Sequence, residues 1–363
     1  MGKGSARSDI IRTMIRTLAL LAAVGLSISA AGCGSSSKSS STSSKTTSTS
    51  STTSQSSASQ RSKSNATSTA FSNLPGAEHP LAQGFPPVHG RSLQEMAGLV
   101  KGEVQFGAAT GSFTPGTRRV AFALNSSSGG FVYAPTVMYI AKSPSSPAKG
   151  PFLAPADPML VAPKYRSKQN AGPGGIQAIY SANVPLPHAG TYDVLTMTEL
   201  PTGLVGGTGE VAVAKSSPIP DIGQKPPSIA TDTPSSVHGD AALLTTRVPA
   251  EQMHSVSLNQ VLGKRPVALL FSTPQLCISK VCGPVTDIAV SLQKQFGNKI
   301  SFIHQEVYVG NQPNKGLRPQ MKAFHLQTEP WLFAINKKGV IVARLEGAFG
   351  VNELRQALQA ALR

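Results

Sequence analysis

The chain has 363 residues, enough for two domains and an additional tail, and its formal net charge is +16. Charged residues make up 14% of the chain and aromatic residues 6%, and the basic residues form no dense run. Charge spread in this way affects solubility and attraction to anionic surfaces rather than the fold. We therefore expect no nucleic-acid partner, and an anionic membrane surface is the more economical partner.

The first 33 residues have the order of an export signal. Basic residues precede an apolar and small-residue stretch over 18–32, which is too short to span a bilayer comfortably. The stretch ends in SAAGC at 29–33, which resembles the lipobox of bacterial lipoproteins. The resemblance implies cleavage before Cys33 and attachment of a lipid to this cysteine. The alternatives are a signal peptide cut after Ala31 and an uncleaved anchor. All three place the remaining chain on an extracytoplasmic surface, such as the outer face of the cytoplasmic membrane.

Residues 34–75 are predicted to form a disordered tether. Residues 34–70 are almost entirely Ser and Thr and show no apolar periodicity, so nothing offsets the entropy of ordering them. A flexible chain of this length has a reach of about 35 Å. We expect it to hold the folded part of the protein clear of the membrane.

Residues 76–215 are predicted to form an all-β domain. Short apolar runs near 104, 120, 137, 176, 192 and 210 alternate with Gly, Pro, Ser and Asn turn signals, a pattern typical of an antiparallel sandwich. The stretch HAGTYDV at 188–194 resembles the Gly-x-Tyr strand start of immunoglobulin-like bacterial modules, which implies an immunoglobulin-like sandwich. One short helix is predicted over 92–99. No catalytic group of residues is apparent, and we expect a structural or partner-binding role.

Prolines over 216–250 predict a stiff linker without regular structure, and residues 251–363 predict an α/β domain. The apolar run Val267–Phe271 has the pattern of a strand buried on both faces. Pro284 is well placed to open an amphipathic helix. The further expected elements are a helix over 255–262, a strand over 300–304, a helix near 318–324, a hairpin of 331–335 with 340–344, and a final helix with Asn352 as its N-cap.

Two cysteines, Cys277 and Cys282, lie between the apolar strand and the amphipathic helix. In an exported chain this pair can form a stable disulfide. Residues five apart in one continuous helix lie too far from each other for that bond. We therefore expect Cys277 in a loop, as the more exposed and attacking thiol, and Cys282 at the first helical turn. Lys280 and the helix N-terminus are expected to lower the pKa of a thiol here.

The element order β-α-β, helix, β-β-α over 251–363 resembles the thioredoxin fold. In that family the reactive cysteine precedes the first helix, and a cis-proline loop before the hairpin faces it. The resemblance makes Pro330, in TEPW at 328–331, the candidate cis-proline. The chain departs from the family in its Cys-x4-Cys spacing and in Leu276, where Trp is usual. It also lacks the buried carboxylate usual late in the first strand, where it has LFS at 270–272.

The fold class predicted is thus a multi-domain chain, an immunoglobulin-like β-sandwich followed by an α/β thioredoxin-like domain. We expect a membrane-anchored thiol-disulfide oxidoreductase that acts on thiols or disulfides of envelope proteins and needs no cofactor. Cys277 would attack, Cys282 would resolve the mixed disulfide, and Pro330 would shape the substrate groove.

Three alternatives stay open. One is a non-enzymatic envelope binding protein whose cysteines form a structural disulfide. Another is a peroxiredoxin-like peroxidase, suggested by Thr273-Pro274 before Cys277, although an extra residue would misplace the threonine hydroxyl. The last is a Sco-like copper chaperone, although His304 and His325 lack a recognisable copper-ligand context.

Overall fold

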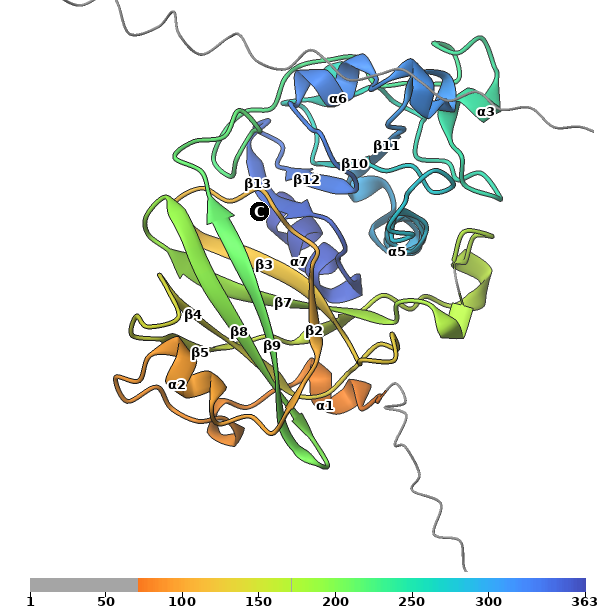
Figure 1. Ribbon diagram of the computed structural model, residues 1–363. Helices are drawn as coiled ribbons and strands as arrows, with labels where there is room; N and C mark the ends of the chain where they lie inside the picture. Colours follow the sequence, from red (N-terminus) through yellow and green to blue (C-terminus); the bar gives the residue numbers. More distant parts are fainter. Residues whose placement is uncertain (1–70, 171) are drawn as a thin grey trace, which may run out of the picture. The chain divides into compact units, whose positions relative to one another are not determined.

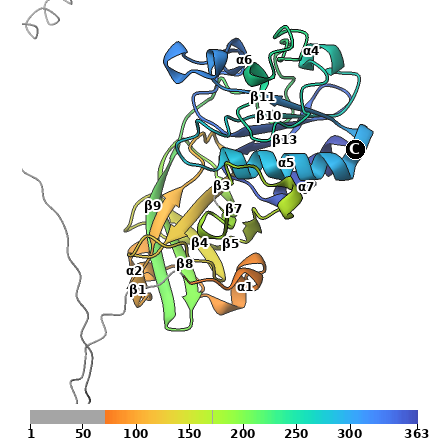
Figure 2. The same cartoon turned by 90° about the vertical axis from the view of Figure 1, so that its right-hand side faces the viewer.

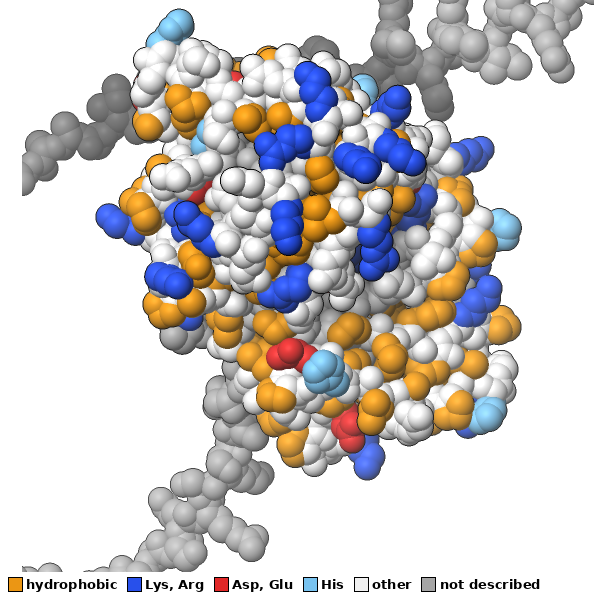
Figure 3. Space-filling view, turned by 180° about the vertical axis from the view of Figure 1, so that it is seen from behind, with side chains coloured by type: hydrophobic (Ala, Val, Ile, Leu, Met, Phe, Trp, Pro, Cys, Tyr) orange, Lys and Arg blue, Asp and Glu red, His pale blue; other side chains and the backbone are white. Residues whose placement is uncertain are grey.

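The computed structural model describes residues 71–363 except residue 171. The predicted signal, the lipobox with Cys33 and most of the tether therefore lie outside the described residues. Within the described part, none of the helices has the length and apolar character needed to cross a membrane. Lys and Arg side chains are scattered over the face seen in Figure 3 and do not merge into one patch.

Two sheets form the β-sandwich, with strand orders β1-β9-β8-β4-β5 and β2-β3-β7-β6. Their inward side chains share one core, to which Phe122 and Tyr180 contribute stacked rings. The first sheet comprises β1 (Gly102–Glu103), β4 (Thr136–Ala141), β5 (Lys149–Leu153), β8 (Gly190–Leu200) and β9 (Gly203–Val213). The second comprises β2 (Gln105–Ala108), β3 (Gly116–Asn125), β6 (Ala156–Pro158) and β7 (Ala178–Leu186).

Short helices lie before and between the strands of the sandwich. They are α1 (Leu74–Glu78), η1 (Ala82–Gly84), α2 (Leu93–Ala97), η2 (Pro163–Tyr165) and η3 (Gly172–Gly174). The helix predicted over 92–99 is α2. It starts there because Ser92 and Glu95 form a capping box, in which each side chain accepts the other residue's backbone N–H.

The C-terminal part has the thioredoxin-like topology expected from the sequence. Its sheet has the order β11-β10-β12-β13, in which β10 and β11 are parallel and the other neighbours are antiparallel. The strands are β10 (Val267–Phe271), β11 (Ser301–Gln305), β12 (Trp331–Ile335) and β13 (Ile341–Glu346). The helices are α3 (Ala241–Leu244), α4 (Leu258–Val261), α5 (Cys282–Phe296), α6 (Pro319–Ala323), α7 (Val351–Ala361), and the 3-10 turns η4 (Gly297–Lys299), η5 (Val309–Asn311) and η6 (Pro313–Lys315).

Alternate residues of β10 face two separate cores, so the strand is buried on both sides as its apolar run predicted. Ala268 and Leu270 pack with α5 and α7, whereas Val267, Leu269 and Phe271 pack with α4 and α6. The first of these cores also contains apolar side chains of the sandwich, so α5 and α7 pack between the C-terminal sheet and strands β3 and β7 (Figure 2). These sandwich residues are Ala121, Met159, Val161 and Ile179.

The start of α7 corrects one expectation. Gly350, not Asn352, is the N-cap residue, and Asp157 of β6 accepts the backbone N–H groups of Asn352 and Glu353 at 3.0 and 2.7 Å. A side chain at position 350 would collide with Asp157, since its Cβ would lie 2.3 Å from the Asp157 Cγ. The capping carboxylate thus comes from the other domain, which no local sequence pattern reveals. Burial raises the pKa of Asp157 to about 6.

The stretch 216–250 contains α3 and otherwise runs without helix or strand along the C-terminal part (Figure 1). Ile219 and Ile229 pack against the core beneath α4 and α6. Asp232 forms an ion pair with Arg318. Near the end of the stretch, Arg247 and Asp287 of α5 form a buried ion pair at 2.9 Å.

Candidate thiol site

Cys277 lies in the turn after β10, and Cys282 is the first residue of α5. Their exposed fractions are 7% and 0%, so Cys277 is the less buried of the two. The backbone between them turns sharply, because the Lys280 N–H donates to the Cys277 carbonyl and Lys280 itself adopts a φ of 58°. That left-handed conformation is uncommon for a residue with a side chain. The turn brings the two sulfur atoms to within 4.8 Å of each other.

The two thiols differ in acidity. The pKa of Cys277 is lowered to about 6, first by a hydrogen bond from Cys282 and then by Ser279 and the backbone amides of Cys282 and Val281, against the opposing effect of burial. Burial raises the pKa of Cys282 well above its ordinary value, and the neighbouring Cys277 raises it further. Cys277 is therefore the thiolate and Cys282 the proton-bearing partner near neutral pH.

The helix N-terminus was expected to lower the pKa of a thiol here, and the structure confirms that effect for Cys277. The groups that lower its pKa are a thiol, a hydroxyl and the amides at the helix N-terminus. The effect expected of Lys280 stays a prediction, and this residue lines the adjacent groove. Ile278, directly after the reactive cysteine, is 94% exposed and projects an apolar side chain to the solvent.

The peptide bond between Glu329 and Pro330 is cis and lies just before β12. The Pro330 carbonyl accepts the Gly347 N–H at 2.8 Å, which joins this loop to the end of the hairpin. A carboxylate oxygen of Glu329 lies within 4.8 Å of both sulfur atoms. Burial raises the pKa of Glu329 to about 7, with further contributions from Cys277 and Glu306.

Sequence reasoning missed Glu329. The thioredoxin resemblance implies a carboxylate late in the strand that became β10, and this chain has none there. The signal that could have revealed Glu329 was its place directly before the candidate cis-proline, the position that the resemblance puts opposite the cysteines.

A groove of about 750 Å³ opens beside the thiols and is lined by both domains. Small residues form much of its wall, and the polar groups in it include Ser279, Lys280 and Glu329. Strand β2 contributes to one side, and the loop after β13 to another. A groove of this size and lining is typical of a binding site.

The sandwich also packs directly on the start of α5. The loop between β6 and β7 approaches so closely that a Cβ on Gly283 would lie 2.7 Å from the Gln169 carbonyl oxygen. Asp287 fixes this loop, because it accepts the Ser167 N–H at 2.9 Å and the Asn170 side-chain amide at 3.1 Å. The position of the resolving cysteine therefore depends on residues of both domains.

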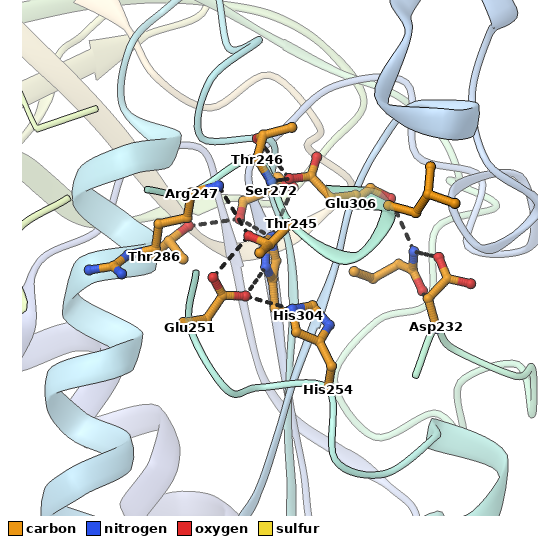
Figure 4. A network of polar contacts seen from close by, with 12 residues as sticks. Asp232, Thr245, Thr246, Arg247, Glu251, His254, Ser272, Thr286, His304 and Glu306 are labelled. Carbon is orange, nitrogen blue, oxygen red and sulfur yellow. Dashed lines mark hydrogen bonds and ion pairs between the residues drawn. The ribbon is translucent and has the colours of Figure 1, made fainter. Parts of the chain in front are cut away.

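A second buried polar group, the histidine centre, consists of Glu251, His254 and His304 (Figure 4). One oxygen of Glu251 contacts a ring nitrogen of each histidine at 2.7 Å. The other oxygen accepts the Thr245 hydroxyl at 2.9 Å. The second ring nitrogen of His304 lies 3.0 Å from the Ser272 carbonyl, to which its protonated form donates. Burial opposes the charged ring, but the Glu251 carboxylate outweighs burial and raises the pKa of His304.

The histidine centre is connected to the thiol site by hydrogen bonds. The Ser272 hydroxyl contacts both His304 and the Thr286 hydroxyl at 2.8 Å. Thr286 in turn donates to the Cys282 carbonyl at 2.7 Å. This chain holds the first turn of α5 against the strand that precedes Cys277.

Two sets of side chains have donor atoms close enough together for a metal ion to be considered: the histidine centre, and the two cysteines with Glu329. We interpret the histidine centre as a hydrogen-bonded ion pair, since its nitrogen–oxygen contacts have hydrogen-bond lengths. Both ring nitrogens of His304 are engaged there, so this residue has no free nitrogen for a copper ion. The backbone amide of Thr273 hydrogen-bonds the Cys282 sulfur rather than Cys277, unlike the threonine contact that a peroxiredoxin-like site would need.

No protein-family model matches the chain, and no curated protein matches it. Among solved structures, one from Chlorobium tepidum described as a thiol:disulfide interchange protein, DsbE, is 15% identical with a TM-score of 0.28. The match covers 40% of this chain and 99% of that chain. A structure of MTB DsbF in mixed oxidised and reduced forms is 16% identical with a TM-score of 0.25, over 33% of this chain and 97% of that chain. At these TM-scores the likeness carries no argument about activity. Neither structure is described as immunoglobulin-like, and that finer assignment of the sandwich stays a prediction.

Proposed function

We propose that the protein is a thiol-disulfide oxidoreductase that exchanges disulfides with other proteins on an extracytoplasmic surface, where a lipid on Cys33 anchors it. Cys277 is the attacking thiol and Cys282 the resolving thiol. Pro330 borders the place where the substrate sulfur approaches. No cofactor is required, because the electrons stay on sulfur throughout.

One observation carries the proposal: the two thiols are adjacent and have opposite pKa shifts. A structural pair gains nothing from such asymmetry, whereas disulfide exchange needs one thiolate to attack and one protonated thiol in reserve. The lowered pKa of Cys277, about 6, keeps it ionised at neutral pH. Cys277 is 7% exposed, whereas Cys282 is fully buried, so Cys277 is the more accessible residue for a substrate.

The chemistry balances on these two residues. The Cys277 thiolate attacks one sulfur of a substrate disulfide, the substrate S–S bond breaks, and the second substrate sulfur leaves as a thiolate. Cys282 then loses its proton and attacks the Cys277 sulfur, which releases the first substrate sulfur. The substrate is reduced and the Cys277–Cys282 pair is oxidised. The reverse sequence oxidises a dithiol, and the relative reduction potentials set the direction.

Trapping tests the assignment of the two roles. A Cys282→Ser variant should accumulate a mixed disulfide between Cys277 and a scrambled-disulfide protein, visible as a higher-mass species that a reductant removes. The matched Cys277→Ser variant should form none. Equal trapping by both variants, or trapping by neither, would contradict the proposal.

The reduction potential separates exchange from a structural bond. We expect a value above about −300 mV, within the range in which disulfides exchange with cellular thiols. Equilibration with glutathione buffers, followed by mass spectrometry of alkylated cysteines, measures it. A disulfide inert to glutathione would instead support a binding protein with a structural bond.

A further inference from the structure

Glu329 stands out because its carboxylate has no hydrogen-bond or ion-pair partner among the described residues, although it is only partly exposed. Other carboxylates near the thiols have donors. One oxygen of Glu306 accepts the Thr246 N–H and hydroxyl at 2.6 and 2.8 Å, while its other oxygen is buried without a partner. Glu346 accepts two backbone amides, from Gly111 and Ser112, at 3.0 Å each. An unpartnered carboxylate beside two sulfur atoms points to a group that exchanges a proton with them.

The proton in question is that of Cys282. This thiol is fully buried, and its pKa is raised, yet it must become a thiolate before it can attack Cys277. Cys277 cannot take that proton during resolution, because its sulfur is then bonded to the substrate. A different acceptor within reach of the buried sulfur is therefore needed.

The other charged or titratable groups around Cys282 are poorly suited as acceptors. Burial and the nearby Glu329 and cysteines raise the pKa of Tyr308, so this phenol keeps its proton at neutral pH. Lys280 lines the same groove but is a cation. One oxygen of Glu306 is occupied by Thr246, and Glu306 does not belong to the group of atoms within 4.8 Å of both sulfurs.

We propose, on the basis of the function proposed above, that Glu329 accepts the proton of Cys282 when the mixed disulfide is resolved. The proton moves from the Cys282 sulfur to the Glu329 carboxylate, and the Cys282 thiolate attacks the Cys277 sulfur. The bond from Cys277 to the substrate breaks, and the substrate leaves as a thiolate. Glu329 lines the groove and is partly exposed, so it can release the proton to solvent and is then ready for the next cycle.

The acidity of Glu329 suits this role. Its pKa of about 7 lies near neutral pH, where a general base combines a useful ionised fraction with sufficient basicity. Glu329 lies in the loop before β12, whereas the carboxylate usual in the thioredoxin family lies late in the strand that corresponds to β10. The end of β10 and the start of β12 are neighbours in the sheet, and both lie next to the start of α5. A residue before β12 can therefore supply the base that β10 lacks.

Stopped-flow reaction of the reduced protein with the aromatic disulfide 5,5′-dithiobis(2-nitrobenzoate) tests the inference. Attack by Cys277 releases one coloured thiolate, and resolution by Cys282 releases a second, so the two steps appear as separate phases. In Glu329→Gln we expect the second phase to slow by about 100-fold and the first to change little. The pH inflection near 7 in the second phase should disappear. Glu329→Asp should restore part of the rate.

Glu103→Gln is the charge-matched control, because Glu103 is an exposed residue of β1. It should leave both phases unchanged. A normal second phase in Glu329→Gln would overturn the inference alone, whereas absence of the first phase in the wild type would overturn the proposed function. A second measurement does not depend on turnover. In a Cys277→Ser background, the alkylation rate of Cys282 should show an inflection near pH 7, and adding Glu329→Gln should remove it. An unchanged pH profile would also overturn the inference.

Discussion

The thiol site and the histidine centre each place a glutamate among partly or fully buried titratable groups, yet they treat it in opposite ways. At the histidine centre burial alone would raise the pKa of Glu251, but His304 and His254 outweigh it and hold that pKa well below its usual range. At the thiol site Glu329 has no donor, and burial raises its pKa to about 7. A glutamate with donors on both oxygens is a structural ion, whereas one facing two sulfurs without a donor is available for proton transfer.

The largest effect is expected from breaking the histidine centre. Glu251→Ala leaves the imidazolium of His304 buried without its counter-ion, and we expect the free energy of unfolding to fall by about 3–5 kcal/mol. Urea denaturation measures the loss. A loss comparable to that of an exposed glutamate such as Glu103 would show that the centre is not a structural ion pair.

The pH dependence of stability provides a second comparison. Below its unfolded pKa of about 9, a thiol with a folded pKa of about 6 loses stabilisation as the pH falls. The reduced wild type should therefore gain about 1–4 kcal/mol relative to Cys277→Ser as the pH rises from 6 to 9. Denaturant titrations of both reduced proteins at several pH values check this. Parallel curves would mean that Cys277 is not an unusually acidic thiol.

The histidine centre should show a different window. Glu251, with a lowered pKa, contributes stability above its unfolded value of 4.5 and loses it as the pH falls below that value. His304, with a raised pKa, contributes below its unfolded value of 6.5 and loses it as the pH rises through the folded value. Both contributions are complete between these two unfolded values, and urea denaturation of the wild type at several pH values should show the maximum there. The His304 contribution falls as the pH rises, opposite in trend to that of Cys277.

The smallest effect on stability is expected at Glu329. Because this carboxylate has no donor and burial raises its pKa from 4.5 to about 7, its ionised form is disfavoured in the fold, so Glu329→Gln should not lower the free energy of unfolding and should raise it modestly above pH 7. Thermal and urea unfolding of the reduced protein measure it, with Glu103→Gln beside it. A loss of several kcal/mol would mean that Glu329 is a structural group like Glu251, and the contrast between the two centres would fail.

Several elements could be predicted because their causes are local. The apolar run 267–271 is β10 at the predicted residues, since both faces of that strand are buried. The short helix predicted over 92–99 is α2, and the capping box of Ser92 and Glu95 that starts it lies within one turn. The parallel pairing of β10 with β11 follows from a strand–helix–strand connection. Asn352 misled the sequence analysis, because its real partner, Asp157, lies in another domain.

The sequence by itself determined the thiol pair and its place between a buried strand and a helix, because both depend on neighbours in the chain. Pro330 was expected only from the resemblance to the thioredoxin fold. Only the tertiary structure decided what surrounds that pair. Glu329 meets Cys282 because adjacent strands bring their ends together, and Gly283 contacts Gln169 because the sandwich packs against α5. Proton affinities depend on distance and burial in three dimensions, so the asymmetry of the two thiols and the pKa of Glu329 could not be derived from sequence spacing.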